Sequence, residues 1–158
     1  MLADGKPMTE ARDMSTMPAL TIHQPYAALI VLSDDNAGLW ARRAGGPKRV
    51  ENRSWYTKRR GHFLVHAGKS TASLRRDGDE QLPRGVVVGS AELIDCIHID
   101  AIRRGEFDDV YPWLREHSHA LGPWCWVIGS VRRFKKPWPA VGRQGWFTLE
   151  VTDVGRPC

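Results

Sequence analysis

The stretch from Gly46 to Lys69 reads GPKRVENRSWYTKRRGHFLVHAGK and carries the densest positive charge of the chain. Seven lysines and arginines surround a single acid, Glu51, and Trp55 and Tyr56 lie among them. Cations neutralise phosphates and flat rings stack on bases, so this mixture is typical of a groove that follows single-stranded nucleic acid. The alternative interpretation is a solvated basic loop between two strands.

The same stretch contains the clearest strand pattern of the sequence, at residues 61–67. Successive side chains of a strand alternate between its faces, which places Phe63 and Val65 on one face and His62 and His66 on the other. One face is therefore expected to be apolar. Each histidine, taken singly, is more readily interpreted as structural than as ligand-binding.

Apolar runs separated by glycine and proline predict the other elements. Strands are expected at residues 19–23, 48–52, 61–67, 85–98, 124–134 and 146–151. A short helix is expected at residues 26–32, with Pro25 in its first turn, and a short helix with a loop at residues 68–84. Within residues 99–122, the spacing of Phe107, Val110, Tyr111 and Leu114 predicts a weak amphipathic helix. Residues 33–45 are expected to form a surface loop, and Gly89 to mark a bulge or a close approach of backbones.

These elements predict an α+β fold. About six strands with two or three flanking helices, closed or nearly closed into a small barrel, would hide the sheet edges. The expected domain organisation is a flexible N-terminal tail at residues 1–18, followed by a single domain at residues 19–158.

The charge lies in two blocks, although the net charge of the whole chain is +5. Residues 42–69 contain nine Lys or Arg and one acid, and residues 117–149 contain five Lys or Arg and no acid. If the fold brings both blocks together beside Trp55, they form one positive face for a polyanion.

Composition argues against several other classes of protein. No apolar run approaches the roughly 20 residues of a membrane helix, and the N-terminus lacks the layout of a signal peptide, so we expect a cytoplasmic protein with no membrane partner. The sequence has three distant cysteines and no P-loop, dinucleotide fingerprint or G-x-S-x-G motif. We expect no cofactor and no metal, since His117 and His119 lack a third ligand nearby.

Residues 46–53, GPKRVENR, are similar to the GxKxxExR signature of the ASCH domain, a family in the PUA-like superfamily of nucleic-acid-binding barrels. Other segments resemble the family in the same order: LTIHQPYA at 20–27, RG at 60–61, LVHA at 64–67, GSAELIDC at 89–96 and GW at 145–146. The segment RSWYT at 53–57 is similar to the ASCH domain of a transcription coactivator. The resemblance covers roughly residues 19–151.

The resemblance implies a PUA-like β-barrel with a cleft for RNA or single-stranded DNA between barrel and helices, and duplex DNA as a further partner. Family members are linked to transcription coactivation, RNA metabolism, ribonuclease activity and, in a small subset, hydrolysis of acylated cytidine. That subset has a threonine three residues after the lysine of the signature. Here that position is Glu51, so the hydroxyl nucleophile is absent.

The matching segments and the second basic block supply the candidate nucleic-acid ligands. They are His23, Gln24, Pro25, Lys48, Glu51, Arg53, Trp55, Arg59, His66, Lys69, Arg132 and Arg143. In this hypothesis the cations neutralise phosphates, Trp55 stacks on a base, and polar side chains such as His23 and Glu51 hydrogen-bond a base or sugar edge. For His23 and Gln24, capping of the strand-to-helix junction is an equal alternative.

An alternative hypothesis is an enzyme that uses the same cleft, either a metal-independent ribonuclease or a nucleobase or nucleoside amidohydrolase. Its candidate catalytic residues are Lys48, Glu51 and His66. Lys48 and Glu51 are three residues apart, so a regular strand would direct them to opposite faces and a bulge would be needed to unite them. For Glu51, an ion pair with Arg53, two residues away on the same face, and contact with a ligand are equal alternatives.

A third hypothesis is a protein-interaction module. It would require an exposed apolar patch, with Trp113, Trp124 or Trp138 as candidates. The alternative for these tryptophans is that they fill the core.

Overall fold

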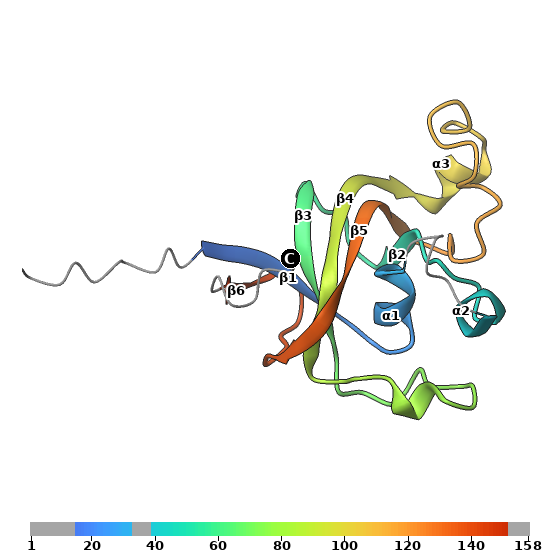
Figure 1. The fold of residues 1–158 in the computed structure, drawn as a ribbon. Coiled ribbons are helices and arrows are strands. Elements are labelled where there is room, and N and C mark those ends of the chain that lie inside the picture. The colour runs from blue at the N-terminus through green and yellow to red at the C-terminus, as the bar shows by residue number, and fades with distance from the viewer. Residues whose placement is uncertain (1–14, 33–38, 152–158) are drawn as a thin grey trace, which may run out of the picture.

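The computed structural model describes residues 15–32 and 39–151, and Figure 1 shows its ribbon. In chain order the elements are β1 (Ser15–Ile22), α1 (Tyr26–Ile30), α2 (Leu39–Arg43), β2 (Val50–Arg53), β3 (Gly61–Ala67), the 3₁₀ helix η2 (Asp79–Gln81), β4 (Val86–His98), α3 (Ile99–Arg103), β5 (Trp124–Pro139) and β6 (Phe147–Val151). Among these residues no helix has the length and apolar character needed to cross a membrane.

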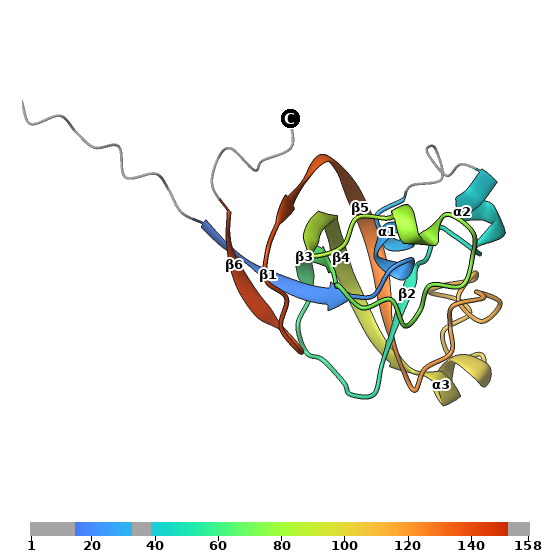
Figure 2. The ribbon, with the colours of Figure 1, turned by 90° about the horizontal axis from the view of Figure 1, so that it is seen from below.

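The six strands form one mixed sheet in the order β2-β5-β4-β3-β1-β6. β1 runs parallel to β3, and the other neighbouring pairs are antiparallel. The parallel pair is possible because the chain between β1 and β3 crosses over through α1, α2 and β2. In Figure 2 the long strands curl around α1, so this helix lies inside the bend of the sheet.

The two longest strands, β4 and β5, pair with each other and approach α1 closely at Gly89. A Cβ atom on Gly89 would lie 2.2 Å from the carbonyl oxygen of Arg132 and 2.7 Å from a methyl carbon of Val31. The register of the β4–β5 pair also shifts between Val87 and Gly89. The predicted bulge and close approach at Gly89 are therefore confirmed.

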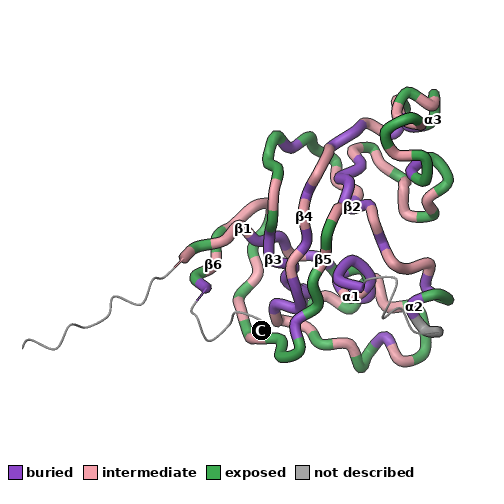
Figure 3. Tube along the Cα trace, turned by 45° about the horizontal axis from the view of Figure 1, so that its top comes forward, coloured by how far each residue is buried: buried purple, intermediate pink, exposed green. Residues whose placement is uncertain are grey.

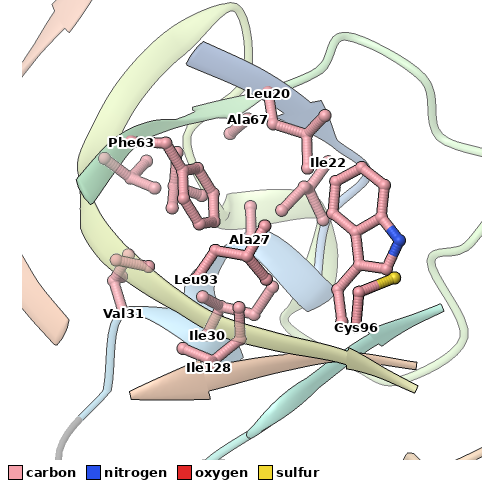
Figure 4. Packing of buried hydrophobic residues seen from close by; sticks show 14 residues of the cluster. Leu20, Ile22, Ala27, Ile30, Val31, Phe63, Ala67, Leu93, Cys96 and Ile128 are labelled. Carbon is pink, nitrogen blue, oxygen red and sulfur yellow. The ribbon is translucent and has the colours of Figure 1, made fainter. Parts of the chain in front are cut away.

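The main core lies between α1 and the inner face of the sheet. Phe63, Leu93 and Ile128, from β3, β4 and β5, pack with Ala27 and Ile30 of α1, and Figure 4 shows these side chains converging. Figure 3 shows that buried residues follow α1, β3 and β4, whereas exposed residues lie in the connecting loops and along much of β5. The apolar face predicted for β3 is thus confirmed as part of the core.

The α+β class, the six strands and the short flanking helices are confirmed, but the sheet is open rather than closed. β2 and β6 are the terminal strands of the series and have no pairing with each other. They are short, with four and five residues, and both ribbon views place them on opposite sides of the molecule (Figures 1 and 2). The curled sheet is therefore only an approximation to the predicted barrel.

Two boundary predictions near the N-terminus are wrong. Residues 39–43, predicted as part of a surface loop, form α2, because the neighbouring Ala41 and Ala44 pack against Leu29 and Leu32. Residues 15–18, assigned to the flexible tail, belong to β1 because they pair with β6. The remainder of the predicted tail and residues 33–38 lie outside the described residues.

Two predictions in the second half of the chain also need correction. The helix expected from the spacing of Phe107, Val110, Tyr111 and Leu114 is wrong: the only helix of residues 99–122 is α3, and the chain turns at Gly105, whose φ is 76°. β5 continues to Pro139 instead of ending at Phe134, since Trp138 and Pro139 pair with β4.

The three tryptophans of the interaction-module hypothesis differ in exposure. Trp124 and Trp138 are partly buried and pack against core clusters, which corresponds to the core-filling alternative. Trp113 is 38% exposed.

Candidate nucleic-acid interface

A pocket of about 460 Å³ opens where the end of β1, the start of α1 and β2 meet the loop that precedes β5. Its lining includes His23, Tyr26, Lys48, Glu51, Arg53 and His119. Lysine and arginine side chains outnumber the acid in this lining, so the pocket is net positive. Its volume falls in the range of small-molecule sites and suits a ligand the size of a nucleoside.

Glu51 joins two cations at the floor of this pocket. Its Oε2 atom contacts Lys48 Nζ, and its Oε1 atom lies 3.1 Å from Arg53 Nε. Lys48 and Glu51 are 4% and 7% exposed. Buried charges are stable only when they are paired, so the three side chains form a single electrostatic unit. The predicted pairing of Glu51 with Arg53 is confirmed.

Lys48 reaches Glu51 without a bulge in β2, which corrects the prediction that one would be needed. β2 begins at Val50, so Lys48 precedes the strand and does not follow its alternation. The backbone N–H of Lys48 donates to the carbonyl of Leu29 in α1, at 2.9 Å. Lys48 Nζ lies 5.3 Å from the centre of the Tyr26 ring, a favourable cation–π distance. Helix α1 therefore positions Lys48 against Glu51.

Arg53 connects β2 to the end of β1. Its Nη2 atom donates to the carbonyl of Thr21, at 2.9 Å, and its guanidinium carbon lies 5.8 Å from the centre of the Trp126 ring. This contact fixes the last residues of β1 beside the pocket. His23, which follows two residues later, consequently lies at the pocket wall.

Asn52 holds the loop that closes the far side of the pocket. Its Oδ1 atom accepts hydrogen bonds from the backbone N–H groups of Leu121 and Gly122, at 3.1 and 2.8 Å. Its Nδ2 atom donates to the carbonyl of His119, at 2.8 Å. Because both polar atoms have backbone partners, Asn52 shapes the pocket by fixing the position of His119.

His119 contributes a neutral ring to the pocket. Burial and the nearby Lys48 lower the pKa of His119 below its ordinary value. Its Nε2 atom lies 3.0 Å from the carbonyl oxygen of Gly45, and since a carbonyl can only accept, Nε2 donates. A neutral ring has one protonated nitrogen, so Nδ1 of His119 is left as a hydrogen-bond acceptor.

His117 attaches the same loop to the segment that precedes β2. Its Nε2 atom accepts from the backbone N–H of Arg49, at 3.0 Å. Burial and the adjacent positive groups lower the pKa of His117 to about 4. The ring is therefore neutral near pH 7, as its acceptor role requires.

The ASCH domain profile matches residues 44–137, a segment that contains the Lys48–Arg53 unit and the loop with His119. This chain belongs to the ASCH domain family. The resemblance predicted from the sequence is thereby confirmed.

Two curated relatives were found by similarity to this ASCH domain. Activating signal cointegrator 1 of Homo sapiens is 27% identical over 139 residues, which cover 78% of this chain and 20% of that protein. Activating signal cointegrator 1 of Mus musculus is 31% identical over 115 residues, which cover 63% of this chain and 17% of that protein. The chain therefore spans about a fifth of the length of these relatives.

Four of the twelve residues predicted as nucleic-acid ligands line the pocket of the ASCH domain. They are His23, Lys48, Glu51 and Arg53. They come from two separate segments, the end of β1 and the GxKxxExR signature, which the fold brings together. The catalytic candidates Lys48 and Glu51 are in contact there.

Three other predicted residues are buried outside the lining of this pocket. Gln24 is fully buried: its Oε1 accepts from Ala28 N–H at 3.0 Å and its Nε2 donates to the Pro83 carbonyl at 2.8 Å. These contacts correspond to the capping alternative, and Pro25 is the buried residue that precedes α1.

His66, the third catalytic candidate, is also buried away from the pocket lining. Its Nε2 atom lies 2.7 Å from the carbonyl of Ala140 and must donate to it. Its Nδ1 atom therefore accepts from the Thr21 hydroxyl, at 3.1 Å. Both ring nitrogens are used in structural hydrogen bonds, so the structural interpretation fits His66 better.

The aromatic candidate Trp55 lies in the loop after β2 and is 37% exposed. Its ring stands edge-on to Trp126, with centroids 4.7 Å apart, and its backbone carbonyl accepts from Trp126 Nε1 at 3.2 Å. Arg59, in the same loop, places its guanidinium carbon 5.0 Å from the centre of the Trp146 ring. The packing on Trp126 and the backbone hydrogen bond therefore fix the orientation of the Trp55 ring, while part of the residue stays exposed.

The remaining predicted cations, Lys69, Arg132 and Arg143, are exposed and do not line the pocket. Arg132 lies on β5 opposite Ser90 of β4. The second basic block thus does not contribute to the lining of the pocket that contains Lys48. Whether both blocks bind one polyanion stays a prediction.

Four residues of this pocket are not among the predicted nucleic-acid ligands: Tyr26, Asn52, Arg76 and His119. Tyr26 and Asn52 lie within the two segments that resemble the family, so neighbouring positions could have been included. Arg76 and His119 come from loops without a local pattern. The sequence of these two loops shows no periodic pattern, so it does not indicate that Arg76 and His119 lie near β2.

Proposed function

We propose that this ASCH domain binds RNA or single-stranded DNA, with one nucleoside in the pocket and the adjoining phosphates on exposed cations around it. The observation that carries the proposal is the charged unit at the floor of a nucleoside-sized pocket, in which Lys48 and Glu51 are buried and Arg53 is partly exposed. Membership of a family in the PUA-like, nucleic-acid-binding superfamily supports the same conclusion.

The pocket provides the hydrogen-bonding types that a nucleoside needs. Glu51 and Nδ1 of His119 are acceptors, whereas Lys48 and Arg53 are donors. Bases and ribose hydroxyls present both types on their edges, and proteins recognise unpaired bases through these edges. Tyr26, a pocket-lining residue that is 36% exposed, adds an aromatic surface.

The loop that follows β2 offers a surface along which the bound nucleic-acid strand can continue beyond the pocket. Trp55 and Tyr56 are 37% and 46% exposed, and each stands edge-on to a partly or fully buried tryptophan, Trp126 or Trp124. Exposed aromatic rings braced in this manner lose little conformational freedom when a base stacks on them. The exposed cations of residues 58–60 adjoin these rings and suit phosphates.

The test measures binding of labelled uridine and deoxythymidine homopolymers by fluorescence anisotropy, with chelator present, and follows cleavage of the same samples on a denaturing gel. We expect binding without cleavage. Arg76→Gln and His23→Ala, at exposed positions of the pocket wall, should each weaken binding about threefold to tenfold. Arg103→Gln, an exposed cation of α3 outside the pocket lining, is the control and should leave affinity unchanged.

A matched pair of tryptophans tests the stacking surface. Trp55→Ala should weaken binding of either homopolymer at least fivefold, since a stacked base contributes about 1–3 kcal/mol. Trp113 has nearly the same exposure, 38% against 37%, but lies outside this loop, so Trp113→Ala should have no effect. Absence of binding to either polymer, or equal losses in both tryptophan variants, would contradict the proposal.

A second candidate function is cleavage of the bound nucleic acid or nucleoside in the same pocket. The contact between Lys48 and Glu51 favours it, because the two groups could share proton-transfer work at one site. In that case the gel shows cleavage by the native protein in chelator. Loss of cleavage in Lys48→Ala, with an unchanged circular dichroism spectrum, would select this function over binding alone.

A further inference from the structure

A second pocket, of about 390 Å³, lies against α1 and is bounded by β4, β5 and the loop before β4. Its interior is mainly apolar, with contributions from Ala28, Val31, Leu32, Val88 and Phe134. Four of these side chains are buried, and Ala28 is partly buried. An apolar cavity of this volume can remove a small hydrophobic group from water.

The two pockets lie on different faces of the same helical segment. Gln24, Ala28 and Val31 line the second pocket and are spaced four and three residues apart, as residues on one helical face are. Tyr26, between them in sequence, lines the first pocket instead. A ligand in the second pocket therefore does not occupy the proposed nucleoside site.

The described polar side chains of the second pocket are few, and they differ in burial and in whether they already have partners. Gln24 is fully buried, and its amide oxygen and nitrogen have the backbone partners Ala28 and Pro83. The other polar side chains in the lining are the cations Arg133 and Lys135, both exposed at the mouth. Among residues 15–32 and 39–151, no acid lines the pocket and neither cation has an ion pair.

We propose that this second pocket binds a small apolar carboxylate, with the hydrocarbon or aromatic part inside and the carboxylate between Arg133 and Lys135. The charge at the mouth is complementary to an anion, and arginine suits a carboxylate in particular. A nucleobase fits poorly, because its polar edge would be buried against apolar walls and a glutamine that already has partners. This inference stands apart from the proposed nucleic-acid function.

The experiment titrates the full chain with sodium octanoate, below its micelle concentration, by isothermal calorimetry and methyl NMR. Octanol is the neutral comparison, and uridine monophosphate the nucleotide comparison. Octanoate should bind saturably and shift the methyl signals of Val31, Leu32 and Val88. Octanol should bind about threefold to tenfold more weakly, since it lacks the carboxylate. Uridine monophosphate should leave these methyl signals unchanged.

Two kinds of variant separate the charged mouth from the apolar interior. The double change Arg133→Gln with Lys135→Gln should reduce octanoate affinity about threefold to tenfold and leave octanol affinity unchanged. Lys58→Gln with Arg59→Gln removes the same charge outside the pocket lining and should change neither affinity. Ala28→Leu, which fills the pocket from α1, should weaken both ligands.

The proposal is overturned if octanoate shows no saturable binding, or if its methyl shifts lie elsewhere in the protein. It is also overturned if uridine monophosphate shifts the same methyl signals with equal affinity, or if both double variants reduce octanoate binding alike. If Ala28→Leu lowers the stability of the fold, the two double variants at exposed cations still provide the decisive comparison of octanoate affinity. Loss of homopolymer binding alone bears on the first pocket and leaves this result unaffected.

Discussion

At the residue scale, the first pocket depends most on Glu51, because one carboxylate compensates two cations. Glu51→Gln would leave Lys48, only 4% exposed, without a counter-charge. Removing one member of a buried ion pair costs about 3–5 kcal/mol, so we expect the free energy of unfolding in urea to fall by roughly that amount.

Glu106→Gln is the control for this measurement. Glu106 pairs with Arg104 at 3.1 Å, but both side chains are more than half exposed. Such surface pairs contribute about 0–1 kcal/mol. If Glu51→Gln loses no more stability than Glu106→Gln, the pairing at the pocket floor is not the electrostatic unit described above.

His117 gives a second prediction at this scale, on the pH dependence of stability. Burial, His119, Lys48 and Arg49 lower its pKa from 6.5 to about 4 in the folded protein. Below pH 6.5 the unfolded chain binds a proton that the folded protein takes up only near pH 4. The free energy of unfolding should therefore be insensitive to this group above pH 6.5 and fall as the pH decreases toward 4.

Urea unfolding at pH 7 and pH 5 checks this dependence. His117→Gln retains an acceptor for the Arg49 N–H but does not titrate, so its stability should change less between the two pH values. Arg103→Gln, at an exposed position of α3 that does not titrate in this range, should keep the native pH dependence. A native dependence in His117→Gln would show that other groups cause it.

The residues that could be predicted are those whose partners are close in sequence. Glu51 and Arg53 are two apart on a strand, so their pairing follows from alternation alone. His119 could not be predicted, because its position depends on Asn52, 67 residues away. The contact of Lys48 with Glu51 also required the true start of β2, which the charge pattern does not reveal.

At the element scale, Gly89 determines how closely β4 can approach β5 and α1. A Cβ atom there would lie 2.2 Å from the backbone oxygen of Arg132, a distance at which the backbone must shift. Gly89→Ala should therefore lower the free energy of unfolding by about 3 kcal/mol or more. Ser90→Ala, at the next position of the strand, should change it by less than about 1 kcal/mol. Similar effects in both variants, measured in urea, would contradict this account.

Strands that are paired on both sides were easier to predict than elements whose secondary structure depends on a single packing contact. β3 agrees with the predicted residues 61–67 at both ends, and β4 differs by one residue at its start. α2 was missed because its helical state depends on packing of Ala41 and Ala44 against α1, and alanines in a polar segment give no periodic signal. The extension of β5 depends on the pairing of Trp138 and Pro139 with β4, across a register shift that the sequence does not reveal.

At the scale of the whole molecule, helix α1 separates two pockets of different character. The first is polar and positive and lies toward β2, whereas the second is apolar and lies toward β4 and β5. The sequence predicted one positive face from two basic blocks, but Arg133 and Lys135 border the second pocket. Arg133 lies opposite Gly89 of β4, beside a register shift of the β4–β5 pair that the charge pattern does not reveal.

The proposed function makes a final prediction about salt, which depends on the charge of the whole surface. Four cations of the loops near the first pocket, Lys58, Arg59, Lys69 and Arg76, are exposed and available to phosphates. Each phosphate of a single strand that is neutralised releases a counterion, so the logarithm of the association constant should fall with the logarithm of salt with a slope of about −3. Uridine has no phosphate, and its weaker binding in the pocket should be nearly independent of salt. Anisotropy for the homopolymer and calorimetry for uridine, across a range of salt concentrations, give both slopes. A slope near zero for the homopolymer would place its binding energy in the pocket and the aromatic rings rather than in phosphate contacts.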